Sequence, residues 1–252
     1  MPHITWCTTG PLSFLPIHAA GDYRTQTMIY DYVVSSYTPT LSTLLPSSRV
    51  PSAFSGMLTV GQTTTPGMPS LPGTAVELDR IQEQFQELRV CRLEGLEATP
   101  TAVLAAVEDA SWVHFACHAN QNLGDPIRSA FHLHGGTLSL ATITQKQLKH
   151  AELAFLSACQ TATGDKSMAD EAVHLAAGML TAGFRTVIAT MWSIGDEDAP
   201  LIAEKVYEHL LEGGVPDSRK AAVAVHKATA CLRAKVGVKE IVKWAPYVHI
   251  GV

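Results

Sequence analysis

Short, almost wholly apolar runs alternate along the chain with longer amphipathic stretches. The clearest runs are WVHFAC at residues 112–117, LAFLSA at 153–158 and TVIATM at 186–191. Runs of this length without polar alternation are typical of parallel strands that are covered on both faces. Because helical patterns separate these runs, the sequence predicts an α/β fold with a mainly parallel sheet and helices on both faces.

Weaker patterns predict the other elements. Further strands are expected at residues 4–8, 28–35, 57–60 and 89–93, and the C-terminal YVHIGV segment is expected to add one more. Helices are expected at 76–88, 100–108, 167–178, 199–211 and 218–235. Thr74 with Glu77 has the pattern of a capping box, and Thr99 before Pro100 that of an N-cap. Gly135 and Gly136 predict the turn of a hairpin over residues 131–140.

The chain has no internal repeat and no clear linker. Its 252 residues suit one domain over 1–252, with residues 1–73 as an alternative semi-independent N-terminal subdomain. A net charge of −5 argues against a nucleic-acid partner, which would favour a basic surface. No apolar run is long enough for a membrane span, and the N-terminus lacks a signal-peptide pattern.

The five cysteines are Cys7, Cys91, Cys117, Cys159 and Cys231. Their number is odd, and no pair has the Cys-x-x-Cys spacing of zinc ribbons or thioredoxin-like redox sites. Free thiols in a reducing compartment are the simplest interpretation, so we expect a cytoplasmic protein.

Two chemically active residues follow two of the apolar runs. His118 comes directly after the run at 112–117, and Cys159 comes at the end of the run at 153–158. In a parallel sheet the carboxyl ends of the strands form one edge, where ligands bind. A thiol and an imidazole at that edge, with backbone N–H groups to hold an oxyanion, are the requirements of a cysteine peptidase.

Several neighbouring residues have plainer interpretations. His114 lies inside a predicted strand, which favours a core histidine, and Cys117 should point to the opposite face from His118 and pack in the core. His132 and His134 are two residues apart in the predicted hairpin but lack acidic or sulfur partners at ligand spacing. We therefore predict no metal site, and no cofactor is required.

Acidic residues follow the third apolar run. Asp196 or Asp198 is suited to capping the helix that contains Pro200, because acids favour a helix N-terminus. The alternative is that one of these carboxylates lines a pocket beside the thiol and selects a basic side chain. The capping interpretation is the stronger of the two on the sequence alone.

Taken together, several segments resemble the CHAT domain, a caspase-like cysteine peptidase family related to caspases and separases and often found after TPR repeats. The matching segments, in the family's order, are WCTTGPLSFLPIHAAG (6–21), VVSSYTPTL (33–41), WVHFACHA (112–119), DPIRSAFHLHGG (125–136), LAFLSACQTATGD (153–165), DEAVHLAAGMLTAG (170–183) and VIATMWSIGDEDAP (187–200). They cover nearly the whole chain, and the combination is highly specific.

The resemblance implies His118 as acid/base, Cys159 as nucleophile, and the backbone N–H groups of Ala119 and Cys159 as the oxyanion hole. Family members usually carry Gly where this chain has Ala119. If that position required a positive φ, the methyl group would cost about 1 kcal/mol or more. The segment MWSIGDED is also similar to the separase pattern after the catalytic cysteine, which implies Asp196, and secondly Asp198, as the group that contacts a basic substrate residue.

The family also implies a protein or peptide substrate in a regulatory, defence or cell-death pathway, and a TPR-containing or other regulatory region as partner. Two other functions stay open. One is a catalytically silent scaffold that mediates protein–protein interactions in a signalling assembly. The other is a thiol hydrolase or acyltransferase with a small-molecule substrate.

Overall fold

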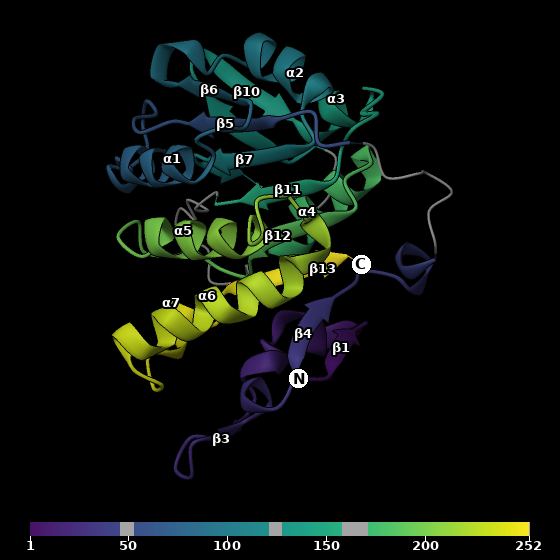
Figure 1. The fold of residues 1–252 in the computed structure, drawn as a ribbon, viewed down its shortest axis with the longest axis vertical. Coiled ribbons are helices and arrows are strands. Elements are labelled where there is room, and N and C mark those ends of the chain that lie inside the picture. Colours follow the sequence, from purple (N-terminus) through teal and green to yellow (C-terminus); the bar gives the residue numbers. More distant parts are fainter. Residues whose placement is uncertain (46–52, 121–127, 158–170, 252) are drawn as a thin grey trace.

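The computed structural model describes residues 1–45, 53–120, 128–157 and 171–251, of which 171–174 are described by their backbone alone. Eight strands in these ranges form one sheet (Figure 1). In spatial order they are β6 (Val90–Glu94), β5 (Met57–Gly61), β7 (Trp112–Ala116), β11 (Leu153–Leu156), β12 (Thr186–Thr190), β13 (Tyr247–Gly251), β4 (Val34–Tyr37) and β1 (His3–Trp6).

The sheet consists of two blocks that run in opposite directions. The strands β6, β5, β7, β11 and β12 are parallel to one another. The last strand, β13, is antiparallel to β12, and β4 and β1 follow the direction of β13. The fold is therefore the predicted α/β type with a mainly parallel sheet. The carboxyl ends of β5, β6, β7, β11 and β12 share one edge.

Helices cover both faces of this sheet. One face carries α1 (Gly73–Gln84), α5 (Ala199–Leu210) and α6 (Ala221–Val236), which lie in a row in Figure 1, and the short α7 (Ile241–Trp244). The helices α2 (Pro100–Asp109), α3 (Leu140–Thr144) and α4 (Glu171–Ala182) belong to the other layer. Short 3₁₀ segments are η1 (Gly10–Phe14), η2 (Ile17–Ala19), η3 (Ile29–Asp31), η4 (Leu41–Leu44), η5 (Gly95–Glu97) and η7 (Ser218–Lys220).

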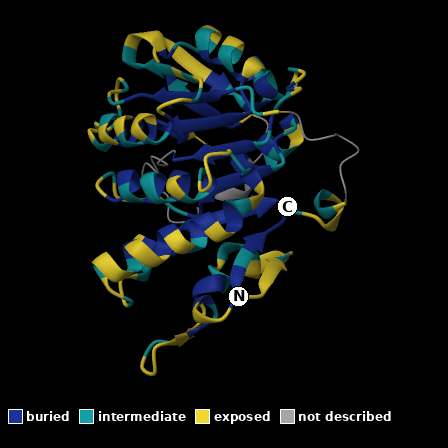
Figure 2. Ribbon diagram, in the orientation of Figure 1, coloured by how far each residue is buried: buried dark blue, intermediate teal, exposed yellow. Residues whose placement is uncertain are grey.

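Each layer has its own apolar core. Aromatic side chains dominate the layer under α1 and α5, where Phe85 packs edge to face against both Trp112 and Tyr207. The opposite layer includes Phe115 stacked on Phe131. Figure 2 shows the buried strands between helices that are exposed on their outer sides. This two-sided burial explains why the central strands have continuous apolar sequences.

Local structure departs from the sequence prediction at residues 28–35. The chain forms a hairpin of β2 (Gly21–Asp22) and β3 (Thr27–Met28), then the 3₁₀ turn η3, and only then β4. The Asp31 carboxylate accepts the Met28 N–H at 3.0 Å, which stabilises the turn. A single strand over 28–35 was therefore wrong, because a local side-chain hydrogen bond competes with extended backbone here.

The two predicted helix caps have different outcomes. The Thr99 hydroxyl accepts the Ala102 N–H at 3.2 Å, so the N-cap before α2 is confirmed. The capping box at Thr74 is wrong, since α1 already begins at Gly73 and the Glu77 carboxylate points inward instead. Its Oε1 lies 3.1 Å from Nε2 of the buried His114. Glu77 is thus part of the core, and so is His114, as predicted.

A second, three-stranded sheet lies beside the carboxyl edge. It contains β8 (Ala119–Asn120), β9 (Ala130–Leu133) and β10 (Gly136–Ser139), all antiparallel. The predicted hairpin corresponds to β9 and β10, with His134 and Gly135 in its turn. The short β8 was not predicted; it continues the chain directly from His118.

Polar side chains cross the reversed block of the main sheet. Both ring nitrogens of His249 on β13 are hydrogen-bonded, Nδ1 to the Ser36 hydroxyl at 2.6 Å and Nε2 to the Thr186 hydroxyl. The Ser36 hydroxyl also lies 2.6 Å from Nε2 of His3. These residues link β1, β4, β13 and β12 from side to side. Burial, with a smaller contribution from the His3 charge, lowers the pKa of His249 to about 3.

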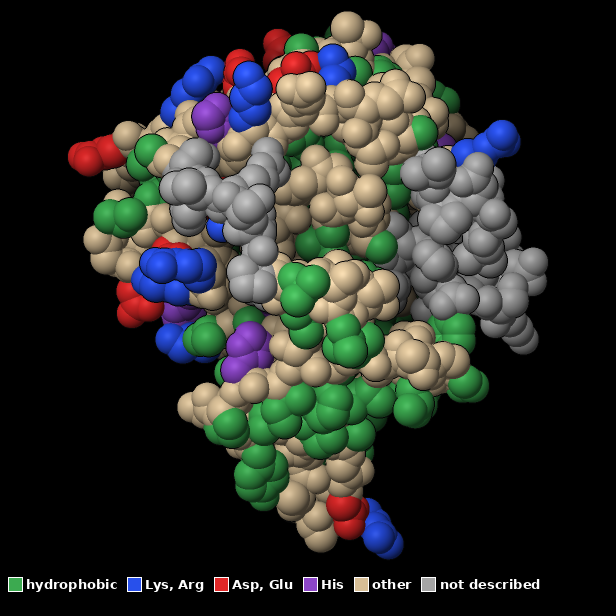
Figure 3. Space-filling view, turned by 90° about the vertical axis from the view of Figure 1, so that its right-hand side faces the viewer, with side chains coloured by type: hydrophobic (Ala, Val, Ile, Leu, Met, Phe, Trp, Pro, Cys, Tyr) green, Lys and Arg blue, Asp and Glu red, His purple; other side chains and the backbone are tan. Residues whose placement is uncertain are grey.

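The surface of the N-terminal segment is unusually apolar. Figure 3 shows hydrophobic side chains gathered over this part of the molecule, above the projecting β2–β3 hairpin. Exposed large apolar side chains in this segment include Ile4, Leu12, Leu15, Leu41 and Leu45. Within the described ranges, none of the helices combines the length and apolar character needed to cross a membrane.

Candidate active site

His118 lies where β7 ends, at the carboxyl edge of the parallel block. Its side chain is almost fully buried, with 2% of its surface exposed. The Nε2 atom lies 2.8 Å from the backbone carbonyl oxygen of Pro69, in the loop between β5 and α1. Because a carbonyl oxygen can only accept a hydrogen bond, Nε2 carries the proton and donates this hydrogen bond to the Pro69 carbonyl. In the neutral ring, Nδ1 is then the basic nitrogen.

The Nδ1 atom is buried, and no described residue forms a hydrogen bond with it. A buried polar atom without a partner is costly, and a catalytic role is one of the explanations for such an atom. The Pro69 carbonyl fixes the ring and its tautomer, and leaves the opposite nitrogen able to take a proton. This is the arrangement that a general base needs.

The predicted nucleophile, Cys159, lies outside the described residues. The described chain follows β11 to Ser157, two residues before it in the sequence. In the register of the sheet, Leu156 on β11 is paired with Phe115 on β7, three residues before His118. The strand that precedes the cysteine and the strand that precedes the histidine are therefore neighbours that end at the same edge.

Ala119 is the first residue of β8 and is buried. Among the described non-glycine residues only Gln26 has a positive φ, so the backbone of Ala119 is not in the left-handed region. His132 donates its N–H to the His118 carbonyl at 2.8 Å, so the hydrogen bond lies beside the Ala119–Phe131 pair and not within it. Ala119 and Phe131 therefore form a non-hydrogen-bonded antiparallel pair, in which the N–H of each residue points away from the partner strand. The Ala119 N–H is thus directed away from β9.

The two candidate pocket acids have separate environments. Asp196 is partly exposed, and its Oδ2 accepts the N–H of Gly73, at the start of α1, at 2.5 Å. Asp198 is buried and its Oδ1 lies 3.0 Å from Nζ of Lys235, on α6. Asp198 precedes α5, but its side chain makes no capping hydrogen bond there. The expected capping of α5 by Asp198 is therefore wrong, and Asp196 instead binds the start of α1.

The loop between β5 and α1 connects these groups. His118 contacts it through Pro69, and Asp196 contacts it through Gly73. A Cβ atom at Gly73 would lie 2.2 Å from the Asp196 carbonyl oxygen, so only glycine permits this approach. Sequence reasoning did not identify Pro69 or Gly73. The Gly- and Pro-rich composition of residues 61–73 was the available signal, but a backbone acceptor has no side-chain signature.

Cys117 and the other histidines near this edge belong to the surrounding structure. The Cys117 side chain is buried in the core, as predicted, on the far side of the strand from His118. His132 lies on β9, where burial first, and the charge of His118 second, lower its pKa. His134 stands in the hairpin turn, and its N–H donates to the Ala98 carbonyl at 2.9 Å.

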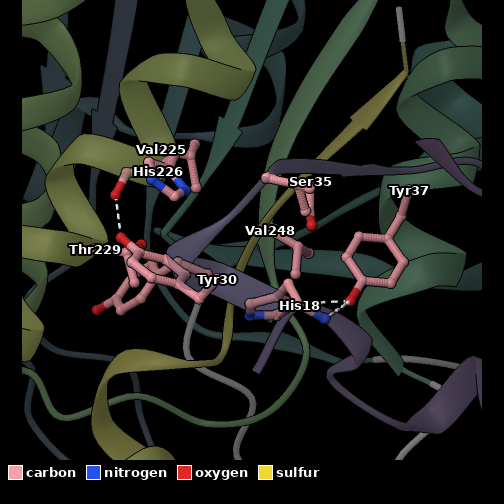
Figure 4. A pocket seen from close by; sticks show the side chains of 10 residues that line it. His18, Tyr30, Ser35, Tyr37, Val225, His226, Thr229 and Val248 are labelled. Carbon is pink, nitrogen blue, oxygen red and sulfur yellow. Dashed lines mark hydrogen bonds between the residues drawn. The ribbon is translucent and has the colours of Figure 1, made fainter. Parts of the chain in front are cut away.

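A small cavity lies away from the edge, between α6 and the reversed block (Figure 4). Its wall includes His18, whose Nδ1 lies 2.7 Å from the Tyr37 hydroxyl and whose Nε2 lies 3.0 Å from the Ala245 carbonyl oxygen. Burial, as the largest cause, lowers the pKa of His18 to about 4. Both ring nitrogens are used, so His18 holds the N-terminal segment against the sheet and is not placed for proton transfer.

Comparison with protein families gives a match over the whole chain. The sequence profile described as "CHAT domain" matches residues 1–252. The chain belongs to the CHAT domain family. A comparison with curated proteins gave no match. The relationship predicted from the seven ordered segments is thereby confirmed for this CHAT domain, and the structure gives the geometry that the family profile leaves out.

Solved structures of caspase-like peptidases have the same fold. The complex of the pro- and mature domains of RgpB from Porphyromonas gingivalis is similar with a TM-score of 0.56 and 12% identity, over 87% of this chain and 55% of that chain. Separase of Saccharomyces cerevisiae, in complex with securin, has a TM-score of 0.56 and 14% identity, over 95% of this chain and 15% of that chain. The CHAT domain thus spans about half the length of the first protein and a small part of the second.

Proposed function

We propose that this CHAT domain is a cysteine endopeptidase that cleaves a protein substrate. The Cys159 thiol gives its proton to His118 Nδ1, and the sulfur attacks the carbonyl carbon of the scissile peptide bond. His118 then returns the proton to the leaving amine as the C–N bond breaks. A water molecule hydrolyses the resulting thioester and restores the thiol. The N–H groups of Ala119 and Cys159 are the proposed donors to the oxyanion.

One observation carries this proposal: the environment of His118. Nε2 is held by the Pro69 carbonyl at 2.8 Å, while Nδ1 is buried with no hydrogen-bond partner among the described residues. His18 and His249, which have structural roles, have both ring nitrogens hydrogen-bonded. The proximity of β7 and β11 at one edge supports Cys159 as the group that the open nitrogen serves.

For specificity we propose a basic residue before the cleaved bond, contacted by Asp196. This carboxylate is partly exposed at the carboxyl edge, whereas Asp198 is buried against Lys235. The solved structure of gingipain R is of an Arg-specific cysteine proteinase, which supports a basic residue by analogy of fold alone. Peptides with Arg, Lys, Asp, Leu or Met at this position test the idea, and a preference for acidic or apolar residues would contradict it.

The test of the peptidase itself uses the exposed thiols of the chain. Cys7, Cys91 and Cys231 are exposed and would react with a thiol-directed peptide probe, so all three are first replaced by alanine. In this background we expect labelling and peptide cleavage, and Cys159→Ala is expected to abolish both. Cys117→Ala, at a buried position, is the matched control and should retain both. Labelling that persists in the Cys159→Ala protein would contradict the assignment.

A further inference from the structure

A cavity of about 660 Å³ opens at the carboxyl edge of the parallel block, beyond His118. It lies among the ends of β5 and β6 and the turn between β9 and β10. The residues that line it are Gln62, Thr64, Thr65, Pro66, Gly95, Leu96, His134 and Gly135. Gln62 is adjacent to the histidine strand, because its N–H donates to the Ala116 carbonyl at 3.0 Å.

The wall combines an apolar surface with a nearly buried glutamine. Leu96 is 76% exposed, and Pro66 lies on the same wall. The Gln62 side chain is 4% exposed; its Nε2 donates to the Thr64 carbonyl at 2.8 Å, which fixes Oε1 as the other atom of the amide. This Oε1 is buried and accepts no hydrogen bond from the described residues.

Among the described residues that line the cavity, none is Asp, Glu, Lys or Arg. An occupant that fits these residues is uncharged and has an apolar side chain for Leu96 and Pro66. A peptide segment with an apolar side chain has both features. The cavity therefore fits a peptide segment better than it fits a charged small molecule.

The direction of the substrate follows from the order of the strands. Along the edge the cavity is at β6 and β5, His118 follows β7, the chain to Cys159 follows β11, and Asp196 follows β12. The acyl part of the substrate stays on the cysteine, and the amine that leaves must reach the histidine that protonates it. The part that leaves therefore extends from β11 across β7 toward β5 and β6, on the opposite side from Asp196.

We propose, resting on the peptidase function above, that this cavity binds the residues that follow the scissile bond and prefers an uncharged, apolar side chain there. The loop between β5 and α1 forms part of its wall with Thr64, Thr65 and Pro66, and the same loop holds the His118 ring through Pro69. The cavity and the catalytic histidine are thus attached to one segment of backbone.

The kinetic test compares two substrate types with the same residues before the bond, taken from the Arg, Lys, Asp, Leu and Met set. One type continues for four residues after the bond, beginning with Leu, and the other ends in aminomethylcoumarin. The readout is the ratio of kcat/KM for the extended peptide to kcat/KM for the coumarin amide. Leu96→Asp should lower this ratio about tenfold, the usual effect of disrupting an apolar substrate pocket. An unchanged ratio would overturn the proposal.

A matched control and a binding measurement separate this proposal from the peptidase function. Val215→Asp changes a similarly exposed side chain, 69% exposed, next to a different cavity, and should leave the ratio unchanged. The extended peptides, labelled with fluorescein, are also titrated against the Cys159→Ala protein and followed by fluorescence anisotropy. Binding that Leu96→Asp weakens supports the cavity even if no substrate is cleaved, in which case the peptidase proposal alone fails. If the peptides do not bind, or if Leu96→Asp leaves their affinity unchanged, the cavity proposal is overturned even if cleavage occurs.

Discussion

The two blocks of the sheet bury histidines in opposite ways. In the reversed block, His249 has both ring nitrogens bonded to hydroxyl groups of neighbouring strands. At the edge of the parallel block, His118 has one nitrogen bonded to the Pro69 carbonyl and the other without a described partner. Both rings are buried, so burial alone does not separate a structural histidine from a reactive one. His118 and His249 differ instead in whether the second ring nitrogen has a hydrogen-bond partner among the described residues.

Other buried polar atoms without a described partner lie near His118. Gln62 Oε1, Thr65 Oγ1, His132 Nε2 and Ser157 Oγ are all buried near the carboxyl edge without a hydrogen bond from the described residues. Leaving such atoms unpaired costs stability. At the edge of the parallel block these atoms lie where substrate atoms are expected, whereas the ladder from His3 to Thr186 in the reversed block is hydrogen-bonded from strand to strand.

The largest expected effect comes from exchanging each histidine for glutamine. His118→Gln keeps an N–H for Pro69 but removes the basic nitrogen, and should lower kcat by about 10²–10⁴-fold with little change in the free energy of unfolding. His249→Gln should do the reverse. It should reduce the free energy of unfolding by about 1–3 kcal/mol, because one of two buried hydroxyls loses its partner, and leave kcat per folded molecule unchanged.

Peptide cleavage and urea unfolding, measured on both variants, check this prediction. The different roles assigned to the two histidines would be contradicted if His118→Gln mainly destabilised the protein, or if His249→Gln lowered the kcat of the folded fraction. Either result would mean that hydrogen-bond completeness does not distinguish the two roles.

The next effect is a loss of stability in mild acid. The pKa values of His18 and His249 are lowered from 6.5 to about 4 and about 3, so between pH 6.5 and 4 the unfolded chain binds protons that the folded chain does not. Stability is therefore fully present above pH 6.5 and decreases as the pH falls. Each histidine contributes a slope of about 1.4 kcal/mol per pH unit, so together they give about 3 kcal/mol per pH unit.

Urea unfolding at pH 7, 6 and 5 measures this slope. His132, His209 and His226, whose pKa values are also lowered, add to it in the same direction. In His249→Gln the slope should decrease by about 1.4 kcal/mol per pH unit, since glutamine does not titrate. A free energy of unfolding that is the same at pH 7 and pH 5 would contradict the assignment of neutral, buried rings.

The smallest expected effect concerns Ala119, where the resemblance to the family leads us to expect glycine. Because its backbone is not in the left-handed region and belongs to β8, glycine offers no conformational gain here. Ala119→Gly should decrease the free energy of unfolding by about 0.5–1 kcal/mol, the usual cost of glycine in a strand, and leave kcat within twofold. A gain in kcat of tenfold or more would show instead that the reacting enzyme needs a backbone conformation that alanine resists.

The sequence was informative wherever a local pattern determines the structure. The runs that became β7, β11 and β12 identified the central strands, and His118 was identified because it directly follows the apolar run at residues 112–117. The reversal of β13, β4 and β1 was not predictable in this way, because strand direction in that block depends on contacts between the first and last segments of the chain. The single-domain organisation over residues 1–252 and the catalytic role of Cys159 stay predictions.

The parts of the site that were missed depend on groups without a sequence signature. The partner of Asp198 is Lys235, 37 residues away, and helix packing brings the two together. The acceptor for His118 is a main-chain carbonyl 49 residues before it. Side-chain patterns identify which residues can react, but not which backbone atoms will orient them.

The Pro69 carbonyl has a consequence for how this family can diverge. Every residue type provides the same carbonyl group, so a substitution at position 69 can change the side chain without deleting the acceptor that holds His118. An insertion or deletion between β5 and α1 would move it. Across distant relatives, we therefore expect the length of this loop to be maintained more strictly than its amino-acid sequence. Sequence alignments that penalise gaps in this loop should separate active members from inactive ones.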